Sequence, residues 1–272
     1  MSPTNNPKRP VALTIAGSDP SGGAGIQADL KTFHQFGVYG EAAITLITVQ
    51  NTRGVERVEF LAADLVADQI RAAIGDIPPA AAKTGALGSR AIVEAVAALA
   101  RDFSFPLVVD PVMVSKHGAP LLAGDALQAI KTFLLPHVFL LTPNLEEASM
   151  LTGVAVSDIS GMRHAAEKLA AMGPQAVLVK GGHLQGDPTD ILFHRGKWTE
   201  FTSPRIETRH THGTGCTFSA AITAELAMGA PLSEAVAVAK AFITSAIRTN
   251  PGLGRGNGPV NHHAAAGLAR RV

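Results

Sequence analysis

Short apolar runs alternate along the chain with longer segments whose apolar residues recur every three or four positions. A short run followed within two residues by Gly, Pro, Asp or Asn is typical of a strand buried inside a sheet. Five runs fit this description, at residues 11–16, 42–49, 107–109, 138–141 and 177–179. A weaker strand is predicted at 80–83, and residues 190–201 have the pattern of a hairpin that turns at Arg195 and Gly196.

The segments between these runs have the spacing of helices packed on a sheet. Ile26, Leu30 and Phe33 stand at i, i+4 and i+7, which is one apolar face of a helix. Further helices are predicted after the N-caps Asp64, Ser89 and Asn144, and over residues 126–134, 162–171, 216–228 and 232–249. Strands that alternate with helices predict an α/β fold, with a mostly parallel sheet covered on both faces. No linker or repeat divides the chain, so we predict one domain over 11–272 after a flexible segment at 1–10.

Charge and composition narrow the classes of function. The 272 residues carry 23 Lys and Arg against 22 Asp and Glu, a net charge of +1. This balance provides no general attraction for nucleic acid or for an anionic membrane. No window approaches the ~18 uninterrupted apolar residues of a membrane helix, and the first ten residues lack the apolar core of a signal peptide. A single cysteine excludes an internal disulfide, so we expect a soluble cytoplasmic protein.

A glycine-rich segment, AGSDPSGGAGIQAD, joins the first predicted strand to the first predicted helix. Its four glycines let the backbone approach a ligand closely, and the N–H groups of the helix point outward. The segment matches a loose dinucleotide fingerprint, but the second strand ends at Gln50 and Asn51 where an acid would hold a ribose. Asp29, beside the apolar Leu30, is either a ligand-binding group or a solvated helix acid.

A second glycine segment, THGTGCTFSAA, contains the only cysteine. Gly213 and Gly215 free the backbone where a helix begins, so successive N–H groups can hold an anion such as a transferring phosphoryl group. Cys216 falls in the first turn of that helix, where the helix dipole lowers the pKa of a thiol. The thiol would then accept a proton from a hydroxyl or hold the attacking oxygen; the alternative is a small buried apolar residue.

Polar residues that follow other strands complete the candidate chemistry. Lys180 ends a strand before two glycines and is placed to neutralise phosphate oxygens, although the chain has no Walker sequence. Asp110 and Glu147 are hard oxygen donors of the kind that Mg²⁺ uses beside phosphates. The alternatives are a surface lysine, a turn-starting aspartate and a first-turn helix acid. The histidine pairs 210/212 and 262/263 lack a third ligand at helical spacing, so we predict no histidine metal site.

These segments resemble one known family from about residue 11 to residue 262. ALTIAGSDPSGGAGIQADLKTF, TVQNTRGV, KTGAL, VVDPVMVSKHG, LLTPNLEEASMLTG, VKGGHLQGDPTDILF and THGTGCTFSAAITAELAMG are similar to the hydroxymethylpyrimidine/phosphomethylpyrimidine kinases of thiamine biosynthesis. The resemblance implies a ribokinase-like three-layer sandwich, ATP with Mg²⁺ as cofactors, and a homodimer. It further implies ATP-dependent phosphorylation of 4-amino-5-hydroxymethyl-2-methylpyrimidine and then of its monophosphate, without nucleic acid or membrane partners.

The resemblance also assigns roles to individual residues. The predicted substrate-binding residues are Gly17, Asp29, Gln50, Ala86 and Met113. The predicted anion hole and catalytic residues are Gly213, Thr214, Gly215 and Cys216, where many superfamily relatives carry Asp in place of the cysteine. The predicted ATP-phosphate residues are Asn144, Lys180 and Thr211, and the predicted metal residues are Asp110 and Glu147. Ala86 stands where relatives commonly carry methionine, which predicts a roomier substrate pocket.

Two other functions stay open. Some vitamin B6 kinases share this architecture and the cysteine, so a pyridoxal or pyridoxine kinase is the nearer alternative. A non-catalytic nucleotide or vitamin sensor is the farther one, because glycine loops alone bind without transferring.

Overall fold

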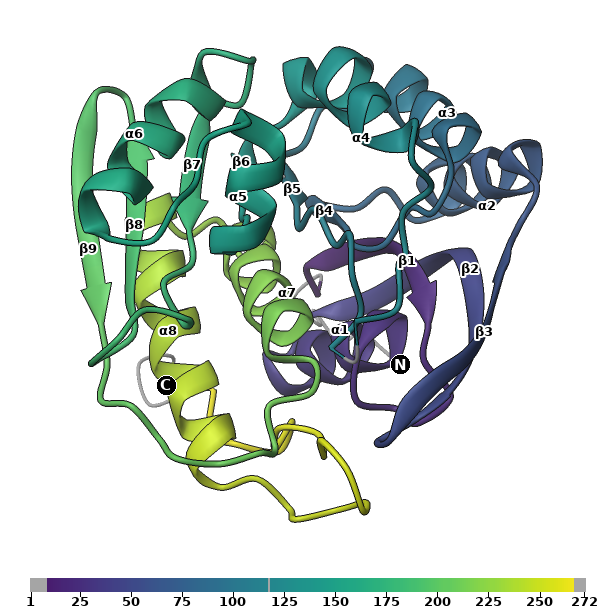
Figure 1. The fold of residues 1–272 in the computed structure, drawn as a ribbon. Helices are drawn as coiled ribbons and strands as arrows, with labels where there is room; N and C mark the ends of the chain where they lie inside the picture. The colour runs from purple at the N-terminus through teal and green to yellow at the C-terminus, as the bar shows by residue number, and fades with distance from the viewer. Residues whose placement is uncertain (1–8, 117, 267–272) are drawn as a thin grey trace, which may run out of the picture.

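The computed structural model describes residues 9–116 and 118–266, and nine strands of this part form one sheet (Figure 1). The strands are β1 (Val11–Ser18), β2 (Tyr39–Asn51), β3 (Gly54–Phe60), β4 (Ala81–Thr84), β5 (Leu107–Val109), β6 (Leu140–Leu141), β7 (Ala176–Val179), β8 (Thr189–His194) and β9 (Lys197–Thr202). Their order across the sheet is β3-β2-β1-β4-β5-β6-β7-β8-β9. Strands β2 through β7 in this order pair in parallel, and β3, β8 and β9 at the edges pair antiparallel.

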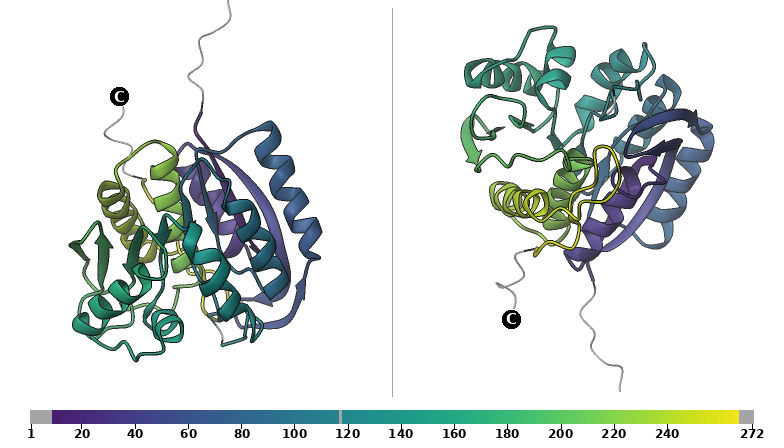
Figure 2. Two further views of the ribbon diagram at one scale, coloured as in Figure 1. Left: turned by 90° about the horizontal axis from the view of Figure 1, so that it is seen from above. Right: turned by 60° about the horizontal axis from the view of Figure 1, so that its bottom comes forward.

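Helices cover both faces of the sheet (Figure 2). They are α1 (Gly25–Gln35), α2 (Ala63–Asp76), α3 (Arg90–Ala100), α4 (Ala126–Ala129), α5 (Leu145–Thr152), α6 (Ile159–Ala170), α7 (Thr214–Ala227) and α8 (Leu232–Arg248). On one face, α1, α7 and α8 share a core in which the rings of Phe36 and Phe242 meet edge to face at 5.0 Å. On the other face, α2 to α6 bury a second core. The predicted three-layer α/β fold is confirmed.

Most predictions of helix caps and turns, which depend on residues a few positions apart, are confirmed. The Ser89 hydroxyl accepts a hydrogen bond from Ile92 N at 3.3 Å, and Asn144 forms a capping box with Glu147. The predicted hairpin turns at Arg195, with φ +52°, and at Gly196. Asp64 is not an N-cap: α2 begins at Ala63 and its N-cap is Ala62, so Asp64 lies inside the first turn.

Two elements differ from the sequence prediction. The helix predicted over residues 126–134 is α-helical only to Ala129 and continues as a π-helical segment, Ile130–Leu134, and a 3-10 turn, Leu135–His137. Strand β3 was not predicted, because GVERVEF has no apolar run; it lies at the sheet edge with most of its side chains exposed or partly exposed. Of the flexible segment expected at 1–10, residues 1–8 lie outside the described residues.

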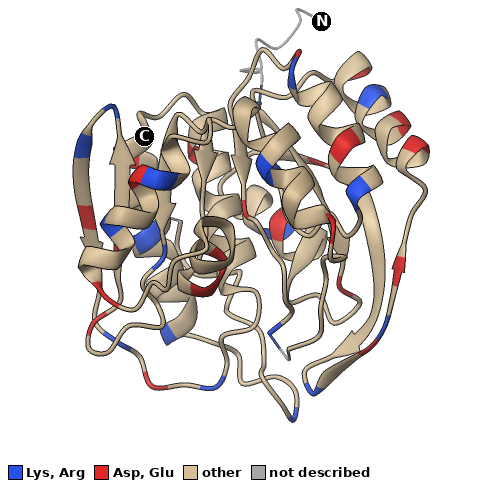
Figure 3. Cartoon of the chain, turned by 45° about the horizontal axis from the view of Figure 1, so that its top comes forward, with Lys and Arg blue, Asp and Glu red and all other residues tan. Residues whose placement is uncertain are grey.

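Charged side chains of both signs are interspersed over the outer helices and strands (Figure 3). This distribution agrees with the net charge of +1. None of the helices in residues 9–116 and 118–266 is long and apolar enough to cross a membrane.

A fully buried ion pair links α1 to β4 beneath the carboxyl edge of the sheet. Lys83 Nζ donates to Asp29 Oδ1 at 2.7 Å, and the Thr14 hydroxyl donates to Asp29 Oδ2 at 2.7 Å. Both charged side chains are 0% exposed, so Asp29 is not a solvated helix acid. Burial alone would lower the pKa of Lys83, but Asp29, Cys216 and Asp110 together outweigh burial and raise that pKa.

Removing one member of this pair should strongly destabilise the fold. We expect Lys83→Met to lower the free energy of unfolding by about 3–5 kcal/mol, because it leaves the Asp29 carboxylate buried without its counter-charge. The measurement is equilibrium denaturation in urea. Arg71→Met is the control, since Arg71 and Asp68 form an exposed pair and such pairs contribute about 0–1 kcal/mol. Equal losses in the two variants would show that the buried pair is no more important than the exposed one.

Candidate active site

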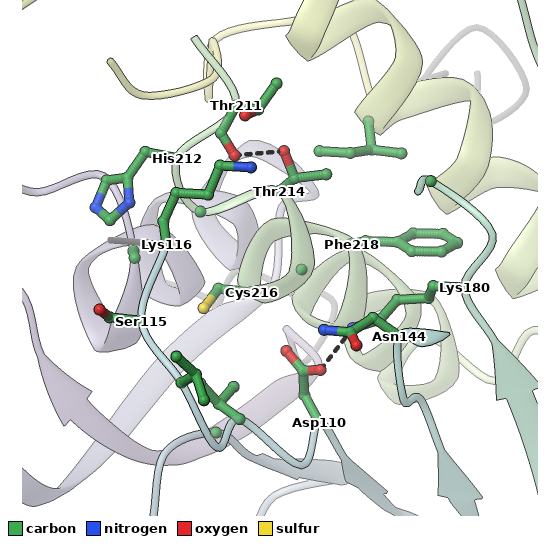
Figure 4. A pocket seen from close by; sticks show the side chains of 18 of the residues that line it. Asp110, Ser115, Lys116, Asn144, Lys180, Thr211, His212, Thr214, Cys216 and Phe218 are labelled. Carbon is green, nitrogen blue, oxygen red and sulfur yellow. Dashed lines mark hydrogen bonds and ion pairs between the residues drawn. The ribbon is translucent and has the colours of Figure 1, made fainter. Parts of the chain in front are cut away.

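A cavity of about 940 Å³ opens at the edge of the sheet where the parallel strands end. Carboxyl ends of parallel strands meet at one edge, so residues far apart in the sequence converge there. The cavity is lined at successive strand ends by Gly17, Gln50, Ala86, Asp110, Asn144 and Lys180. Figure 4 shows that Asp110, Lys180 and Cys216 face the same space.

The structure brings every predicted site residue except Asp29 to this cavity. Besides those at the strand ends, the lining includes Met113, Glu147, Thr211, Gly213, Thr214, Gly215 and Cys216. Asp29 is not among the lining residues: its fully buried carboxylate is bonded to Lys83 and Thr14, so its role in substrate binding stays a prediction. The helical pattern around Leu30 could not distinguish an acid buried in the core from an acid that lines a cavity, because both lie on the helix face that is turned toward the interior of the protein.

The first glycine segment is organised by Asp19, which the sequence analysis did not single out. Asp19 Oδ1 accepts from Ser21 N at 2.8 Å, and Oδ2 accepts from Ala24 N at 2.9 Å and Gly23 N at 3.2 Å. Oδ2 also lies 2.8 Å from His212 Nε2. Burial would raise the pKa of Asp19, but the hydrogen bonds from His212 and Ser21 outweigh burial and lower it. The ionised carboxylate therefore holds the loop closed.

The second glycine segment forms the N-terminus of α7. Gly213 is the N-cap in a left-handed conformation, with φ +78°, and no side chain caps the helix. A Cβ at Gly213 would lie 1.8 Å from Gly23 O, so only glycine lets the two loops meet. Thr214 Oγ1 donates to Thr211 O at 2.7 Å and fixes the turn (Figure 4). The backbone N–H of Thr214 donates to Thr211 O at 3.3 Å. The N–H groups of the next two residues, Gly215 and Cys216, lie in the first turn, where the helix offers them no carbonyl partner, and they can bind an anion in the cavity.

Lys180, Asp110 and Glu147 form a charged cluster against this turn. Lys180 Nζ donates to Asp110 Oδ1 at 2.7 Å (Figure 4). A Cβ at Gly215 would lie 3.3 Å from Lys180 Nζ and 3.4 Å from Asp110 Oδ2, so the ion pair touches the helix N-terminus. Burial would lower the pKa of Lys180, but Asp110 and Glu147 raise it to about 12. Burial raises the pKa of Glu147 to about 7, against the opposing effect of Lys180.

Cys216 stands in the first turn of α7, as predicted, but its pKa is not lowered. Burial raises the pKa of the partly buried thiol to about 12; Lys83 opposes this and the Asp29 and Asp110 carboxylates add to it. The helix dipole expected to stabilise a thiolate is therefore outweighed by desolvation and two neighbouring carboxylates. At neutral pH Cys216 is a neutral thiol that faces the cavity (Figure 4).

His212 belongs to the site, although its spacing from His210 suggested only an ordinary histidine. Its backbone N–H donates to Gly258 O at 3.0 Å, and Val260 N donates to His212 O at 3.3 Å. The segment before the C-terminal tail thus runs beside the start of α7 (Figure 2, right). In the described residues no group of three His, Cys, Asp or Glu could hold a metal ion.

One wall of the cavity has no counterpart in the sequence prediction. It is formed by residues 203–208 and by one face of α8, which contributes Lys240, Ile243, Thr244 and Ile247. Lys240 Nζ donates to Asp190 Oδ2 at 2.7 Å, which ties α8 to β8. The apolar part of this wall suits a flat aromatic group. The sequence predicted the helix, but it gave no sign that one face of α8 lines a cavity.

Known proteins share both the sequence and the architecture. A family model described as phosphomethylpyrimidine kinase matches residues 19–261. A hydroxymethylpyrimidine/phosphomethylpyrimidine kinase of Streptomyces coelicolor is 47% identical over 265 residues, 97% of this chain and 98% of that protein. The thiamine biosynthesis bifunctional protein ThiED of Geobacter sulfurreducens is 50% identical over 95% of this chain. The chain spans about half of that longer relative, 53% of its length.

Solved structures of two kinases share the architecture. An ADP complex of Bacillus subtilis pyridoxal kinase matches with a TM-score of 0.87 and 40% identity, covering 94% of this chain and 98% of that one. A phosphomethylpyrimidine kinase from Clostridium difficile matches with a TM-score of 0.78 and 42% identity, covering 88% of this chain and 100% of that one. The family predicted from the motifs is confirmed: this chain belongs to the phosphomethylpyrimidine kinase family.

Proposed function

We propose that this protein phosphorylates 4-amino-5-hydroxymethyl-2-methylpyrimidine with ATP, and then phosphorylates the resulting monophosphate to the diphosphate. The observation that carries the proposal is the meeting of the α7 N-terminus with Lys180 and Asp110 in one cavity. Phosphoryl transfer depends mainly on positioning and on stabilising negative charge. A bare helix N-terminus beside a lysine supplies both, and family membership supplies the substrate class.

We place ATP between the strand-end residues and the wall formed by residues 203–208 and α8. Its phosphates would meet Lys180, Asn144 and Thr211, and its base would lie on the wall formed by residues 203–208 and α8. The related pyridoxal kinase is described in complex with ADP, which supports nucleotide use in this architecture.

Mg²⁺ fits the donor set beside these phosphates. Asp110 and Glu147 both line the cavity, and Mg²⁺ is usually held by one or two carboxylates with phosphate oxygens and water. Glu147 uses Oε2 to accept from Asn144 N, which leaves Oε1 for a cation. When bound, the metal would neutralise charge on the β- and γ-phosphates. Asp110 would meanwhile keep Lys180 oriented through their ion pair.

The substrate ring is assigned to the opposite side of the cavity. Gly17, Gln50, Ala86 and Met113 line that side, and a Cβ at Gly17 would lie 2.5 Å from Leu46 Cδ1. The amide of Gln50 offers a donor and an acceptor. A 4-aminopyrimidine presents a ring nitrogen acceptor beside an amine donor, so the two groups pair doubly. Pyridoxal lacks that amine, and this difference favours the pyrimidine.

Cys216 is assigned to hold the acceptor oxygen. Its thiol is neutral and lies in the cavity wall with Gly25 of the first glycine segment, whose backbone opposes the rise in the thiol pKa without overcoming burial. A neutral thiol can hydrogen-bond a hydroxyl and aim it at the γ-phosphorus without taking its proton. Of the two roles that the sequence left open, base or holder of the attacking oxygen, we propose the second, because burial raises the pKa of the thiol to about 12.

Family membership supports the remaining proposals. We place the catalytic unit in one domain over 11–272, which agrees with a single sheet in the described residues. We also propose a cytoplasmic location, a homodimer and partners limited to small molecules, as the resemblance to the family implies. A vitamin B6 kinase is the second candidate, favoured by the likeness to pyridoxal kinase.

The function is tested by ADP release with hydroxymethylpyrimidine, its monophosphate and pyridoxal as acceptors. We expect both pyrimidines to be turned over with higher kcat/KM than pyridoxal. Gln50→Met should cost about tenfold to hundredfold with the pyrimidine, because an unpaired buried polar group costs ~1–3 kcal/mol, and far less with pyridoxal. Pyridoxal as the better substrate would favour the vitamin B6 kinase, and no ADP release with any acceptor would favour a sensor.

The role of Cys216 is tested by two substitutions. We expect Cys216→Ala to lower kcat by about 10²-fold, because a misplaced acceptor loses the aligned geometry of transfer. Cys216→Ser should stay within about tenfold of the wild type, since a hydroxyl is also neutral at pH 7. The pH profile of kcat should keep its acidic limb in Cys216→Ser. If serine is as inactive as alanine and that limb disappears, Cys216 acts as a thiolate base instead.

The raised pKa of Glu147 predicts a pH dependence of stability without metal and nucleotide. The folded chain keeps a proton up to pH of about 7, whereas the usual value for glutamate is 4.5. Raising the pH between these values therefore favours the unfolded chain, which has already released the proton. The wild type should lose stability relative to Glu147→Gln across this window, measured by denaturation midpoints. A difference that is constant with pH would contradict the shift.

A further inference from the structure

The second of the two proposed reactions has a charge problem that the first lacks. Resting on the proposed function, the first acceptor is a neutral alcohol and the second is a phosphate monoester, which carries about −1.5 to −2 charge at pH 7. The same cavity must then hold this anion beside the phosphates of ATP. A cation that the first reaction does not require would offset the repulsion.

Four lysine and arginine side chains line the cavity in the described part of the chain: Lys116, Lys180, Arg205 and Lys240. Three of them already have partners. Lys180 is paired with Asp110, Lys240 with Asp190, and the Arg205 guanidinium donates to the carbonyl oxygens of residues 182, 184 and 186. Lys116 is exposed and, among the described residues, has neither an ion pair nor a hydrogen bond through its ammonium group.

Lys116 lies on the side of the cavity where the acceptor is placed. It follows Met113 and Ser115 in the loop after β5, and these two residues also line the cavity. In Figure 4 its side chain extends toward Thr211 and Thr214, at the start of α7. The positive charge of Lys116 also acts on His183, another lining residue: burial lowers the pKa of His183 most, and Lys116 is the next largest cause.

We propose that Lys116 binds the phosphate of the monophosphate acceptor and so serves the second phosphorylation specifically. In that reaction a non-bridging oxygen of the monoester forms the bond to the γ-phosphorus of ATP. The bond from that phosphorus to the β,γ-bridging oxygen breaks, and ADP leaves with the electron pair. The dianionic acceptor has no proton to lose, so the need is for a counter-charge rather than a base.

Small residues on the substrate side of the cavity leave space for the longer, phosphorylated acceptor. The attacking oxygen must take the place that the alcohol oxygen takes in the first reaction, beside Cys216. The pyrimidine ring must then lie farther from α7 by the length of a phosphate group. Ala86, with a single methyl group, and Gly17 line that wall, and the cavity holds about 940 Å³.

The test compares both acceptors in Lys116→Met, Lys116→Arg and wild type, with saturating ATP. We expect Lys116→Met to lower kcat/KM for the monophosphate by about 10- to 100-fold, the usual effect of a charge-assisted hydrogen bond. With the alcohol it should change less than about twofold, and the KM for ATP should not change. Lys116→Arg should restore most of the loss. Lys197→Met, an exposed lysine on β9, is the control that should affect neither reaction.

The pH dependence gives a second readout that a merely structural role would not move. The monoester takes up a proton with a pKa of about 6, so the defect of Lys116→Met should shrink as the pH falls below 6. Equal losses on both acceptors with a raised KM for ATP would place Lys116 on the nucleotide and overturn the proposal. Full activity of Lys116→Met on the monophosphate would also overturn it. Failure of the wild type to phosphorylate the monophosphate would instead refute the proposed function itself.

Discussion

The active site depends on one close contact, between the two glycine segments at opposite ends of the sequence. The α7 N-cap, Gly213, packs on the carbonyl of Gly23 so closely that a Cβ would lie 1.8 Å from the oxygen. Asp19 and His212, which are 193 positions apart, lock this contact with a buried hydrogen bond of 2.8 Å. The contact fixes where α7 begins, and with it the direction in which its free N–H groups point. Lys180 and Asp110 meet that point from the strand ends.

Burial and neighbouring charges together set the protonation of the site. The cluster of Lys180, Asp110 and Glu147 carries two carboxylates for one ammonium group in a space largely closed to water. The lysine is therefore held charged, while Glu147 keeps its proton up to pH of about 7. Up to that pH the Lys180 ammonium group balances the single carboxylate of Asp110, and a divalent cation beside phosphates would favour release of the Glu147 proton and binding to the second carboxylate. Two acids placed close together and away from water explain both the raised pKa of Glu147 and the proposed metal site.

The sequence predicted features that depend on residues close together in the chain. It missed features that depend on contacts between distant segments. The Ser89 and Asn144 caps follow from residues a few positions apart, and both are confirmed. The order of strands and helices is also confirmed, apart from β3. The strand-end location of Lys180 and Asp110 follows from parallel topology, which the alternation of elements already implied. The burial of Asp29, the raised pKa of Cys216 and the bond between Asp19 and His212 need the three-dimensional packing. Strand β3 escaped because an exposed edge strand requires no apolar run.

A neutral thiol at the start of α7 suits a site that accepts two differently charged substrates. A carboxylate at position 216 would stand near those of Asp110 and Asp29, both of which already raise the pKa of the thiol. Such a group could assist a neutral alcohol, but it would repel a phosphate monoester brought to the same place. The thiol of Cys216 orients either acceptor and repels neither. In the proposed pair of reactions the residue beside the acceptor oxygen is therefore shared, and discrimination between the acceptors falls to cations at the rim of the cavity.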